Sequence, residues 1–504
     1  MFRAATRWLD ERLDLAGLRR ALLDRAVPSG LTWWHTLGSA TLTVLVVQVV
    51  TGTILAMYYS PSPDHAYDSI NYIDHTVVSG ALLRGIHHWG ASAMVVLVVA
   101  HMVRVFVMGA YKYPREINWV LGILLLVVVM GFGFTGYLLP WDQKAYWATQ
   151  VGTSIAGTTP VVGGTVVEVL RGGGQLGAAT LTRFYSLHVL VLPLTIGVIV
   201  LLHLAIVIRQ GIAAPPKVLE REAPPIAGGP GYARFYDERY KESKAGGVRF
   251  WPDIIAKDIL VGTIVVAILV VLARVQGAGL EAAADPTDSS YVPRPEWYFL
   301  PFFQLLKLVP GGGESLVAVG VPGLITLGLL LLPFFDRRSV RSLTRRPLAL
   351  VSLGGAAAAT ALLFGAAVRS APSASEAPEV GRPLTNIERA GRTLFGQQQC
   401  GGCHQIKLRS AQDKGGGAAG PSIAPDLTSI GLVHSTNWFH SFLEDPRRFH
   451  PDSKMPAFGP PTLTHQEIEE LAQYLSSLRG PNWATQQPDY RDTFPELVKS
   501  RGAQ

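Results

Sequence analysis

Four histidines lie within apolar stretches of the sequence, His87 and His101 in one stretch, and His188 and His203 in another. The members of the two pairs are 14 and 15 residues apart. At about 100° and 1.5 Å per helical residue, each pair lies on roughly one helix face, about 21–22 Å apart. Imidazoles are costly in hydrocarbon and usually have a function there. Two such helices side by side would offer two stacked bis-histidine sites, suited to two non-covalent b-type haems.

A neighbouring histidine, His88, could also pair with His101. A step of 13 residues leaves about 140° between the two side chains, whereas a step of 14 leaves about 40°. We therefore expect His87 to be the ligand; hydrogen bonds between helices are the alternative role for all these histidines. Four glycines form two pairs with the same 14-residue spacing as His87 and His101. Because they have no side chains, they would let flat macrocycles approach the flanking helices. They are Gly38 and Gly52 in the first apolar stretch, and Gly122 and Gly136 in the third.

The only two cysteines, Cys400 and Cys403, belong to the motif CGGCH, which ends at His404. This pattern is typical of covalent c-type haem attachment through two thioethers, with the histidine as an axial ligand. A disulfide or half of a zinc site is the alternative, but a zinc site needs further ligands nearby. Met455 in KMPAF is the candidate sixth ligand. Four histidines are rival ligands that we expect at the surface: His434, His440, His450 and His465.

The apolar residues, 48% of the chain, come in blocks of about 20, the length that spans a bilayer. We expect seven spans, near 36–59, 85–108, 118–139, 183–208, 253–275, 315–335 and 347–368. The predicted fold class is therefore all-α. A four-helix di-haem bundle and three further membrane helices precede a soluble helical cytochrome c domain, with helices expected at 386–399 and 465–479.

The expected parts follow from shifts in composition along the chain. They are an amphipathic cytoplasmic surface helix (1–30), the di-haem bundle (31–210), a cytoplasmic linker (211–252), the three-helix domain (253–368), a Pro-rich linker (369–383), the cytochrome c domain (384–480) and a polar tail (481–504).

Basic residues favour a cytoplasmic N-terminus, because they gather before the first span and in every second loop. This bias accounts for most of the net charge of +7, so we do not expect nucleic-acid binding. Seven spans then place residue 369 outside the cytoplasm, where c-type haem is attached. The expected location is a bacterial-type cytoplasmic membrane. Three arginines near span ends could pair with haem propionates, or only reach the interface: Arg84, foremost, Arg104 and Arg183.

Long segments of the chain resemble the Rieske/cytochrome b (bc1/b6f) complexes. Residues 30–210 resemble the short cytochrome b of the b6f type through HHWGASAMVV, YKYPREINWV, FGFTGYLLPWDQ and LTRFYSLH. Residues 250–368 resemble the separate subunit IV of that complex through FWPDII and RPEWYFLPFFQLLKLVP, and residues 384–480 resemble a class I cytochrome c. The resemblance covers nearly the whole chain, as a fusion of three proteins.

The resemblance implies a quinol–cytochrome c oxidoreductase that oxidises quinol at the outer face and translocates protons. The family signature PEWY comprises Pro295, Glu296, Trp297 and Tyr298, and a carboxylate such as Glu296 can accept a quinol proton. The segment Gly136–Trp141, with Tyr137 and Pro140, would form another wall of that site.

Family resemblance also implies two electron paths. One electron would pass through the His87–His188 and His101–His203 haems to an inner quinone. The other would pass to a separate Rieske iron–sulfur protein, because this chain has no Rieske Cys/His pattern, and then to the chain's own c haem. A soluble cytochrome or an oxidase would follow, and the family suggests a homodimer among membrane lipids.

The sequence departs from the b6f pattern at His35, which stands where that type has a cysteine holding an extra haem. A covalent extra haem is excluded; we expect a structural role for His35, while a non-covalent haem stays open. Asp24, Arg25 and Arg209 are weak candidates for the inner quinone site. The alternatives are a di-haem membrane anchor that relays electrons for a dehydrogenase, or a non-catalytic carrier or assembly subunit. Glu296 argues against a relay, which needs no outer quinol site.

Overall fold

The computed structural model describes most of the chain in two compact units. The first comprises residues 1–145, 149–283 and 313–361, and the second comprises 146–148, 284–312 and 362–504. The described residues are 2–281, 283–284, 294–309, 315–370, 384–398, 400–404, 406, 424, 427, 430–432, 434–451, 453 and 455–478. The expected tail (481–504) and most of the expected linker (371–383) lie outside the described residues.

Seven helices in the described part of the chain are long and apolar enough to span a membrane, as predicted. They run over Trp33–Ala56 (a short turn and α3, Leu37–Ala56), Gly80–Val107 (α5), Glu116–Tyr137 (α6), Ala178–Gln210 (α9, Ala178–Ser186, and α10, Leu192–Gln210), Phe250–Val275 (a turn and α13, Ile255–Val275), Leu316–Phe335 (a turn and α15, Val321–Phe335) and Pro347–Arg369 (α16).

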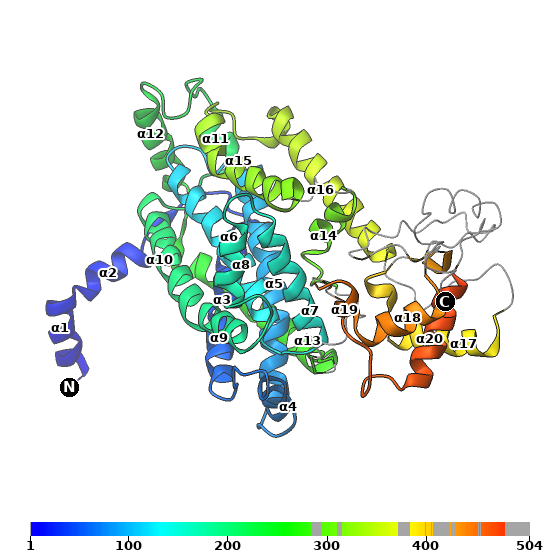
Figure 1. The fold of residues 1–504 in the computed structure, drawn as a ribbon. Helices are drawn as coiled ribbons and strands as arrows, with labels where there is room; N and C mark the ends of the chain where they lie inside the picture. Colours follow the sequence, from blue (N-terminus) through cyan, green and yellow to red (C-terminus); the bar gives the residue numbers. More distant parts are fainter. Residues whose placement is uncertain are drawn as a thin grey trace. The chain divides into compact units, whose positions relative to one another are not determined.

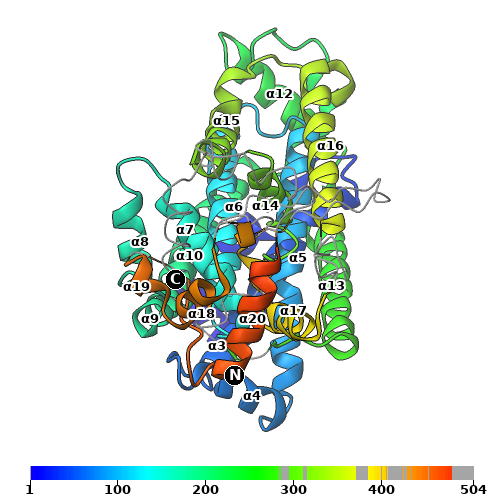
Figure 2. The same cartoon turned by 45° about the vertical axis from the view of Figure 1, so that its right-hand side comes forward.

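The helices of the first unit pack side by side, with α3 and α13 against α5, and α10 against α6 (Figures 1 and 2). Helices satisfy most of their backbone hydrogen bonds internally, which hydrocarbon requires. Large apolar side chains such as Leu194, Leu201 and Ile264 remain exposed on these helices. Such faces suit lipid tails.

The fourth span is not a regular α-helix throughout. One π-helical turn, Leu187–Val191, joins α9 to α10 and contains His188. A π turn accommodates one extra residue relative to an α-helix. The 15-residue spacing from His188 to His203 therefore acts as a 14-residue spacing, and it matches the His87–His101 spacing on α5.

The N-terminal segment forms two helices where one was expected, α1 (Phe2–Leu13) and α2 (Leu15–Leu22). Asp14 breaks the run, because its backbone is left-handed (φ 45°) and its side chain accepts a hydrogen bond from Gly17 N at 2.9 Å. A carboxylate in this position caps the second helix. The exposed Trp8, Leu9 and Leu13 keep an apolar face on α1.

Residues 211–252, expected to be a cytoplasmic linker, contain a packed helical segment. They include α11 (Pro216–Glu220) and α12 (Tyr232–Ala245). Tyr232, Tyr236 and Tyr240 are buried along α12, because a four-residue spacing aligns side chains on one helix face. The short strands β1 (Ala26–Val27) and β2 (Val248–Arg249) pair antiparallel and connect this segment to the N-terminal region.

Shorter helices flank the spans of the first unit. They are α4 (Ala66–His75), α7 (Gln143–Gly157) and α8 (Gly163–Arg171). The sixth span is attached to the bundle by polar bonds: Trp119 donates to the Leu329 carbonyl at 2.6 Å, and the buried Lys112 ammonium bonds Asp336 at 2.8 Å. These bonds unite the subunit IV-like helix with the four-helix bundle.

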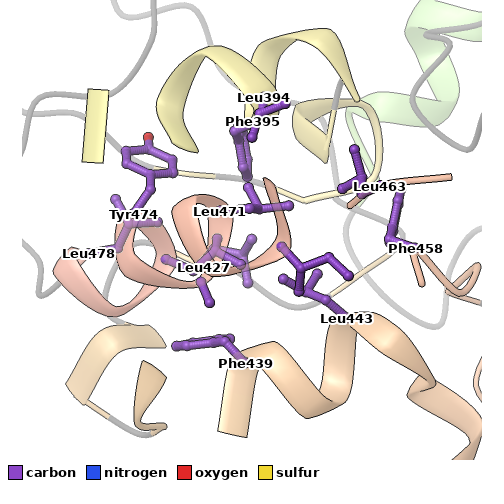
Figure 3. Packing of buried hydrophobic residues seen from close by; sticks show 13 residues of the cluster. Leu394, Phe395, Leu427, Phe439, Leu443, Phe458, Leu463, Leu471, Tyr474 and Leu478 are labelled. Carbon is purple, nitrogen blue, oxygen red and sulfur yellow. The ribbon is translucent and has the colours of Figure 1, made fainter. Parts of the chain in front are cut away.

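The cytochrome c region is a small helical core in the second unit. It contains α17 (Asn386–Gln397), α18 (Thr436–Glu444), α19 (Pro446–Phe449) and α20 (His465–Ser477). Figure 3 shows Leu394 and Phe395 of α17 beside Leu471 of α20, with Phe439 and Leu443 of α18 on the opposite side. The two predicted helices of this domain are α17 and α20.

Candidate haem sites

His87 of α5 and His188 of the fourth span face each other in the first unit. Their ring centroids are 6.4 Å apart and their ring planes are 75° apart. A metal–imidazole bond is about 2.0–2.1 Å long, so two rings on opposite sides of one metal have centroids roughly 6 Å apart. The separation therefore suits a shared haem iron. The side chain of His88 is exposed beside Trp89, in agreement with the choice of His87.

Two threonines determine which nitrogen of each ring is available. Thr51 donates its hydroxyl proton to the Val47 carbonyl at 2.7 Å, and its oxygen lies 2.9 Å from Nδ1 of His87. Thr135 repeats the arrangement, with 2.8 Å to Gly131 O and 3.0 Å to Nδ1 of His188. Because each hydroxyl has already donated, it accepts from Nδ1–H. The lone pair of Nε2 is then left for a metal, the usual role of a second partner behind a ligand histidine.

Sequence reasoning missed these two threonines, although a signal was present. Thr51 directly precedes Gly52 and Thr135 directly precedes Gly136, whereas leucines precede Gly38 and Gly122. A Thr-Gly pair on each flanking helix thus places one hydroxyl and one open backbone position beside the same histidine.

Each of the four predicted glycines lies against one of the four histidines. A Cβ added at Gly136 would lie 2.5 Å from Cε1 of His188, and one at Gly52 would lie 3.0 Å from Cε1 of His87. At Gly38 the distance to His101 is 3.1 Å, and at Gly122 the distance to His203 is 3.9 Å. The space that remains beside each ring because glycine has no side chain fits flat groups at both histidine pairs.

His101 and His203 line a single large cavity of about 1090 Å³ in the first unit. This volume lies at the upper end of ordinary ligand pockets, about 300–1,000 Å³. Nδ1 of both rings is buried and has no hydrogen-bond partner among the described residues. Two imidazoles, a glycine cradle and this space fit a haem, as at the first pair.

The three predicted propionate partners differ in their surroundings. Arg104 lines the cavity, and its buried Nε has no hydrogen-bond partner among the described residues. Arg84 already pairs with Asp74 at 2.6 Å and bonds the Ala278 carbonyl, while the exposed Arg183 donates to the carbonyls of Glu168 and Val169. Of the three, Arg104 lies in the cavity of the second pair with a buried nitrogen unbonded among the described residues, whereas Arg84, foremost in the sequence-based order, is held in an ion pair.

The weaker candidates near the His101–His203 pair also differ in their surroundings. Arg25 and His35 line the cavity, and Nδ1 of His35 accepts from Thr32 N at 3.1 Å. That bond fits the expected structural role of His35. Asp24 pairs with Arg19 at 3.3 Å, whereas Arg209 is exposed and does not line the cavity.

The CGGCH motif lies in a helical turn, Cys400–Gly402, directly after α17. The backbone N–H of His404 donates to the Cys400 carbonyl at 3.0 Å. Cys400 and Met455 both pack against the same hydrophobic core, although 55 residues separate them in the sequence. Burial raises the pKa of the Cys400 thiol to about 12 and also raises the pKa of the Cys403 thiol. Cys400 and Met455 on one apolar core, with Cys403 and His404 in the turn that follows Cys400, fit a c-type haem.

The PEWY residues belong to the second unit, where they precede α14 (Leu300–Lys307). Arg294 donates to the Ala367 carbonyl near the C-terminal end of α16 at 2.7 Å. Pro295, Glu296 and Tyr298 are partly buried, and Trp297 is exposed. Burial, followed by the nearby Glu296 carboxylate, raises the pKa of Tyr298. Tyr137 ends α6 in the first unit, with the Lys144 ammonium 5.3 Å from its ring centre.

The segment that leads to PEWY is attached at the His87 end of the bundle. Trp89 donates to the Gly277 carbonyl at 2.7 Å, and Tyr67 donates to the Glu281 carbonyl at 2.8 Å. The backbone N–H of Glu281 also donates to Asp142 at 3.1 Å. Residues 277–281 therefore cross the bundle at the ends of α5 and α6 that carry His87 and Gly136.

Family models match three consecutive parts of the chain. Residues 22–211 match "Cytochrome b/b6/petB", residues 283–376 match "Cytochrome b(C-terminal)/b6/petD", and residues 388–479 match "Cytochrome c". These matches follow the predicted order of the three fused parts.

Individual relatives agree. Cytochrome b6 of Synechococcus elongatus is 43% identical over 208 residues, 41% of this chain and 97% of that protein. Cytochrome b6 of Oltmannsiellopsis viridis is 45% identical over the same length and share. Among solved structures, a chain of a "Hyperthermophilic respiratory Complex III" matches with a TM-score of 0.62 and 27% identity, covering 78% of this chain and 96% of that one. This chain belongs to the cytochrome b/b6 family, as an electron-transfer subunit that carries a C-terminal cytochrome c domain.

Proposed function

We propose that this chain is the core of a membrane quinol–cytochrome c oxidoreductase that couples quinol oxidation to proton translocation. The observation that carries the proposal is the repetition of one histidine–glycine arrangement at two depths of the same helices. Nε2 of His87 and His188 would hold one b-type haem, and His101 and His203 would hold a second. Two such sites in series give electrons a path across the bilayer.

The third proposed group is one covalently attached haem c. Cys400 and Cys403 would form its thioethers, with His404 and Met455 as axial ligands. The shared packing of Cys400 and Met455 on one core supports this set. Bound haems supply one-electron redox chemistry, while the protein residues hold them, limit water access and orient the ligand rings.

Glu296 is the proposed proton acceptor for quinol. A positioned carboxylate that accepts a proton contributes typically about 10²–10⁴-fold to a rate. The partly buried Glu296 and Tyr298 offer such a carboxylate beside an aromatic hydroxyl. Pro295 and Trp297 would shape the same loop, and Tyr137 is a further candidate for contact with quinol.

The orientation we propose has the N-terminus in the cytoplasm and both PEWY and the cytochrome c domain on the outer, periplasmic side. Arg294 bonds the end of α16 from which the chain continues toward the cytochrome c domain. The segment at 277–281 lies at the His87 end of the bundle. The first observation supports a common side of the membrane for PEWY and the cytochrome c domain, and the second supports the same side for the segment that leads to PEWY.

The proposed partners follow from the electron balance. Quinol gives up two electrons and two protons. One electron would return through the b haems to a quinone near His101 and His203, and the other would reach the c haem through a separate Rieske iron–sulfur protein. A soluble cytochrome or an oxidase would accept the electron from the c haem. The complex is proposed to be a homodimer embedded in membrane lipids.

Quinol-driven turnover of purified complex, compared between wild type and Glu296→Gln, tests the assignment. We expect turnover to fall about a hundredfold, since the neutral amide cannot accept a proton. The b and c haem spectra should stay unchanged. Glu281→Gln, an exposed carboxylate in the same loop, is the control and should retain full turnover. Unchanged turnover in Glu296→Gln would contradict the assignment of Glu296 to an outer quinol site. It would favour the alternative of a di-haem anchor that only relays electrons.

A further inference from the structure

Three side chains on the surface of the cytochrome c domain lie close together. They are His440, Glu444 and His465, and one ligand atom of each lies within 4.8 Å of the others. Nδ1 of His465 is 3.0 Å from Oε1 of Glu444, and Nδ1 of His440 is 3.9 Å from the same oxygen. The two imidazole rings are nearly parallel, with 6.1 Å between their centroids.

The packing of α18 positions two of the three residues. Phe439 and Leu443 face the core (Figure 3). His440 and Glu444 each follow one of these residues, so they form the neighbouring row of side chains, one helical turn apart. Their side chains are 26% and 34% exposed. Both are therefore anchored by a buried row, yet remain accessible from solvent.

The start of α20 supplies the third residue. Thr464 caps this helix through reciprocal bonds with Glu467, which makes His465 the first helical residue. Leu463, immediately before the cap, is buried in the core, and Phe458 N donates to the Leu443 carbonyl at 2.8 Å. These contacts fasten the segment before α20 to the end of α18. His465 is thereby held opposite Glu444 on a side chain that is 72% exposed.

We propose that His440, Glu444 and His465 bind one divalent transition-metal ion, Zn²⁺ by the nature of the donors. Two imidazoles and one carboxylate are a known ligand set for zinc with an open fourth position. Ligand atoms around tetrahedral zinc lie roughly 3.3 Å apart, given bonds of about 2.0–2.2 Å. The observed 3.0 and 3.9 Å bracket this value. Rotation of the exposed His465 side chain can adjust the separation between the two imidazole ligand atoms, which is at most 4.8 Å.

The site is separate from the proposed haem function and would join α18 to α20, two of the helices that enclose the core beside Cys400 and Met455. An ion pair between histidines and Glu444 is the competing explanation for the same geometry. A metal site predicts that one Zn²⁺ binds per chain and that binding needs all three side chains, whereas an ion pair predicts no such binding.

Equilibrium dialysis of the purified, tag-free complex against micromolar Zn²⁺ separates the two explanations. We expect the double variant His440→Ala/His465→Ala to bind one Zn²⁺ per chain fewer than wild type. His450→Ala, an exposed histidine nearby on the same domain, should bind as wild type does. Zinc bound elsewhere on the complex cancels in this difference.

A c-haem spectrum identical to wild type establishes that a variant is folded. If the double variant fails this criterion, Glu444→Gln, which preserves shape, takes its place and should weaken binding at least tenfold. The Zn²⁺ K-edge spectrum of wild type should report imidazole ligands that are missing in the variant. Equal zinc content in wild type and the folded variant overturns the proposal.

Discussion

The two histidine pairs of the membrane bundle share their spacing but differ in what surrounds their rings. At His87 and His188, each Nδ1 is bonded to a threonine hydroxyl, and added Cβ atoms at the facing glycines would lie 2.5–3.0 Å from the rings. At His101 and His203, both Nδ1 atoms lack partners among the described residues, and the rings line a cavity of about 1090 Å³. One bundle thus contains a tightly held site and a roomy site.

This difference has a physical reading. Hydrogen bonds behind ligand histidines fix ring orientation and increase ligand basicity. A roomy cavity lined by Arg25, Arg104 and Lys257 suits a site that also admits a second molecule. The space at the second pair is the basis for proposing quinone reduction there.

The largest expected effect comes from removing the ligands. His87→Leu and His203→Leu should each lower the haem b content of the purified complex by one half, because each variant removes one of the two proposed axial imidazoles of its site. The pyridine haemochrome assay measures this content. His88→Leu should retain the full amount, since that side chain is exposed; a loss of haem b there would contradict the pairing of His87 with His188.

Adding one methyl group should separate the tight site from the roomy one. Gly136→Ala would place Cβ 2.5 Å from the His188 ring, closer than real Cβ contacts, whereas Gly122→Ala would place it 3.9 Å from His203. We expect Gly136→Ala to lose most of one haem b and Gly122→Ala to retain both, by the same assay. Equal losses of haem b in the two variants would contradict the proposed difference in packing between the two histidine pairs.

Removing one hydroxyl should change the redox behaviour of the first pair only. Thr135→Val deletes the acceptor for Nδ1–H of His188, so ligand basicity falls and the ferric form is less favoured. The midpoint potential of that haem should rise by tens of millivolts, given about 59 mV per tenfold change for one electron. Redox titration of the b bands measures it. Thr195→Val, an exposed threonine on α10, is the matched control and should cause no shift.

Removing one charge should have the smallest effect, and only at the second pair. Arg104→Gln deletes a cation that lines the cavity with His101. The midpoint potential of that haem should fall by roughly ten to a few tens of millivolts, because a nearby cation favours the reduced form. Arg183→Gln, whose parent side chain is exposed, should leave both potentials unchanged. A midpoint-potential shift in Arg104→Gln that is confined to the His87–His188 haem would contradict the placement of Arg104 beside the other haem.

Several features of the site were predictable from local patterns. The spans, the choice of His87 over His88 and the four glycines all follow from helical periodicity, which is a property of neighbouring residues. The threonines were visible in the sequence only as Thr-Gly pairs, and their role depends on which helix faces which. The pairing of Arg84 with Asp74 was not predictable, because many polar residues of the chain could have satisfied that charge.

The sequence by itself determined the order of the three fused parts, the seven apolar spans and the candidate ligand types at each proposed haem site. Covalent order and hydrophobic period are sufficient for these. Only the tertiary structure decided that a π turn at Leu187–Val191 compensates for the 15-residue spacing, that residues 211–252 pack around α12, and that His440, Glu444 and His465 meet. These depend on contacts between segments distant along the chain, whose free energy is set by packing rather than by local propensity.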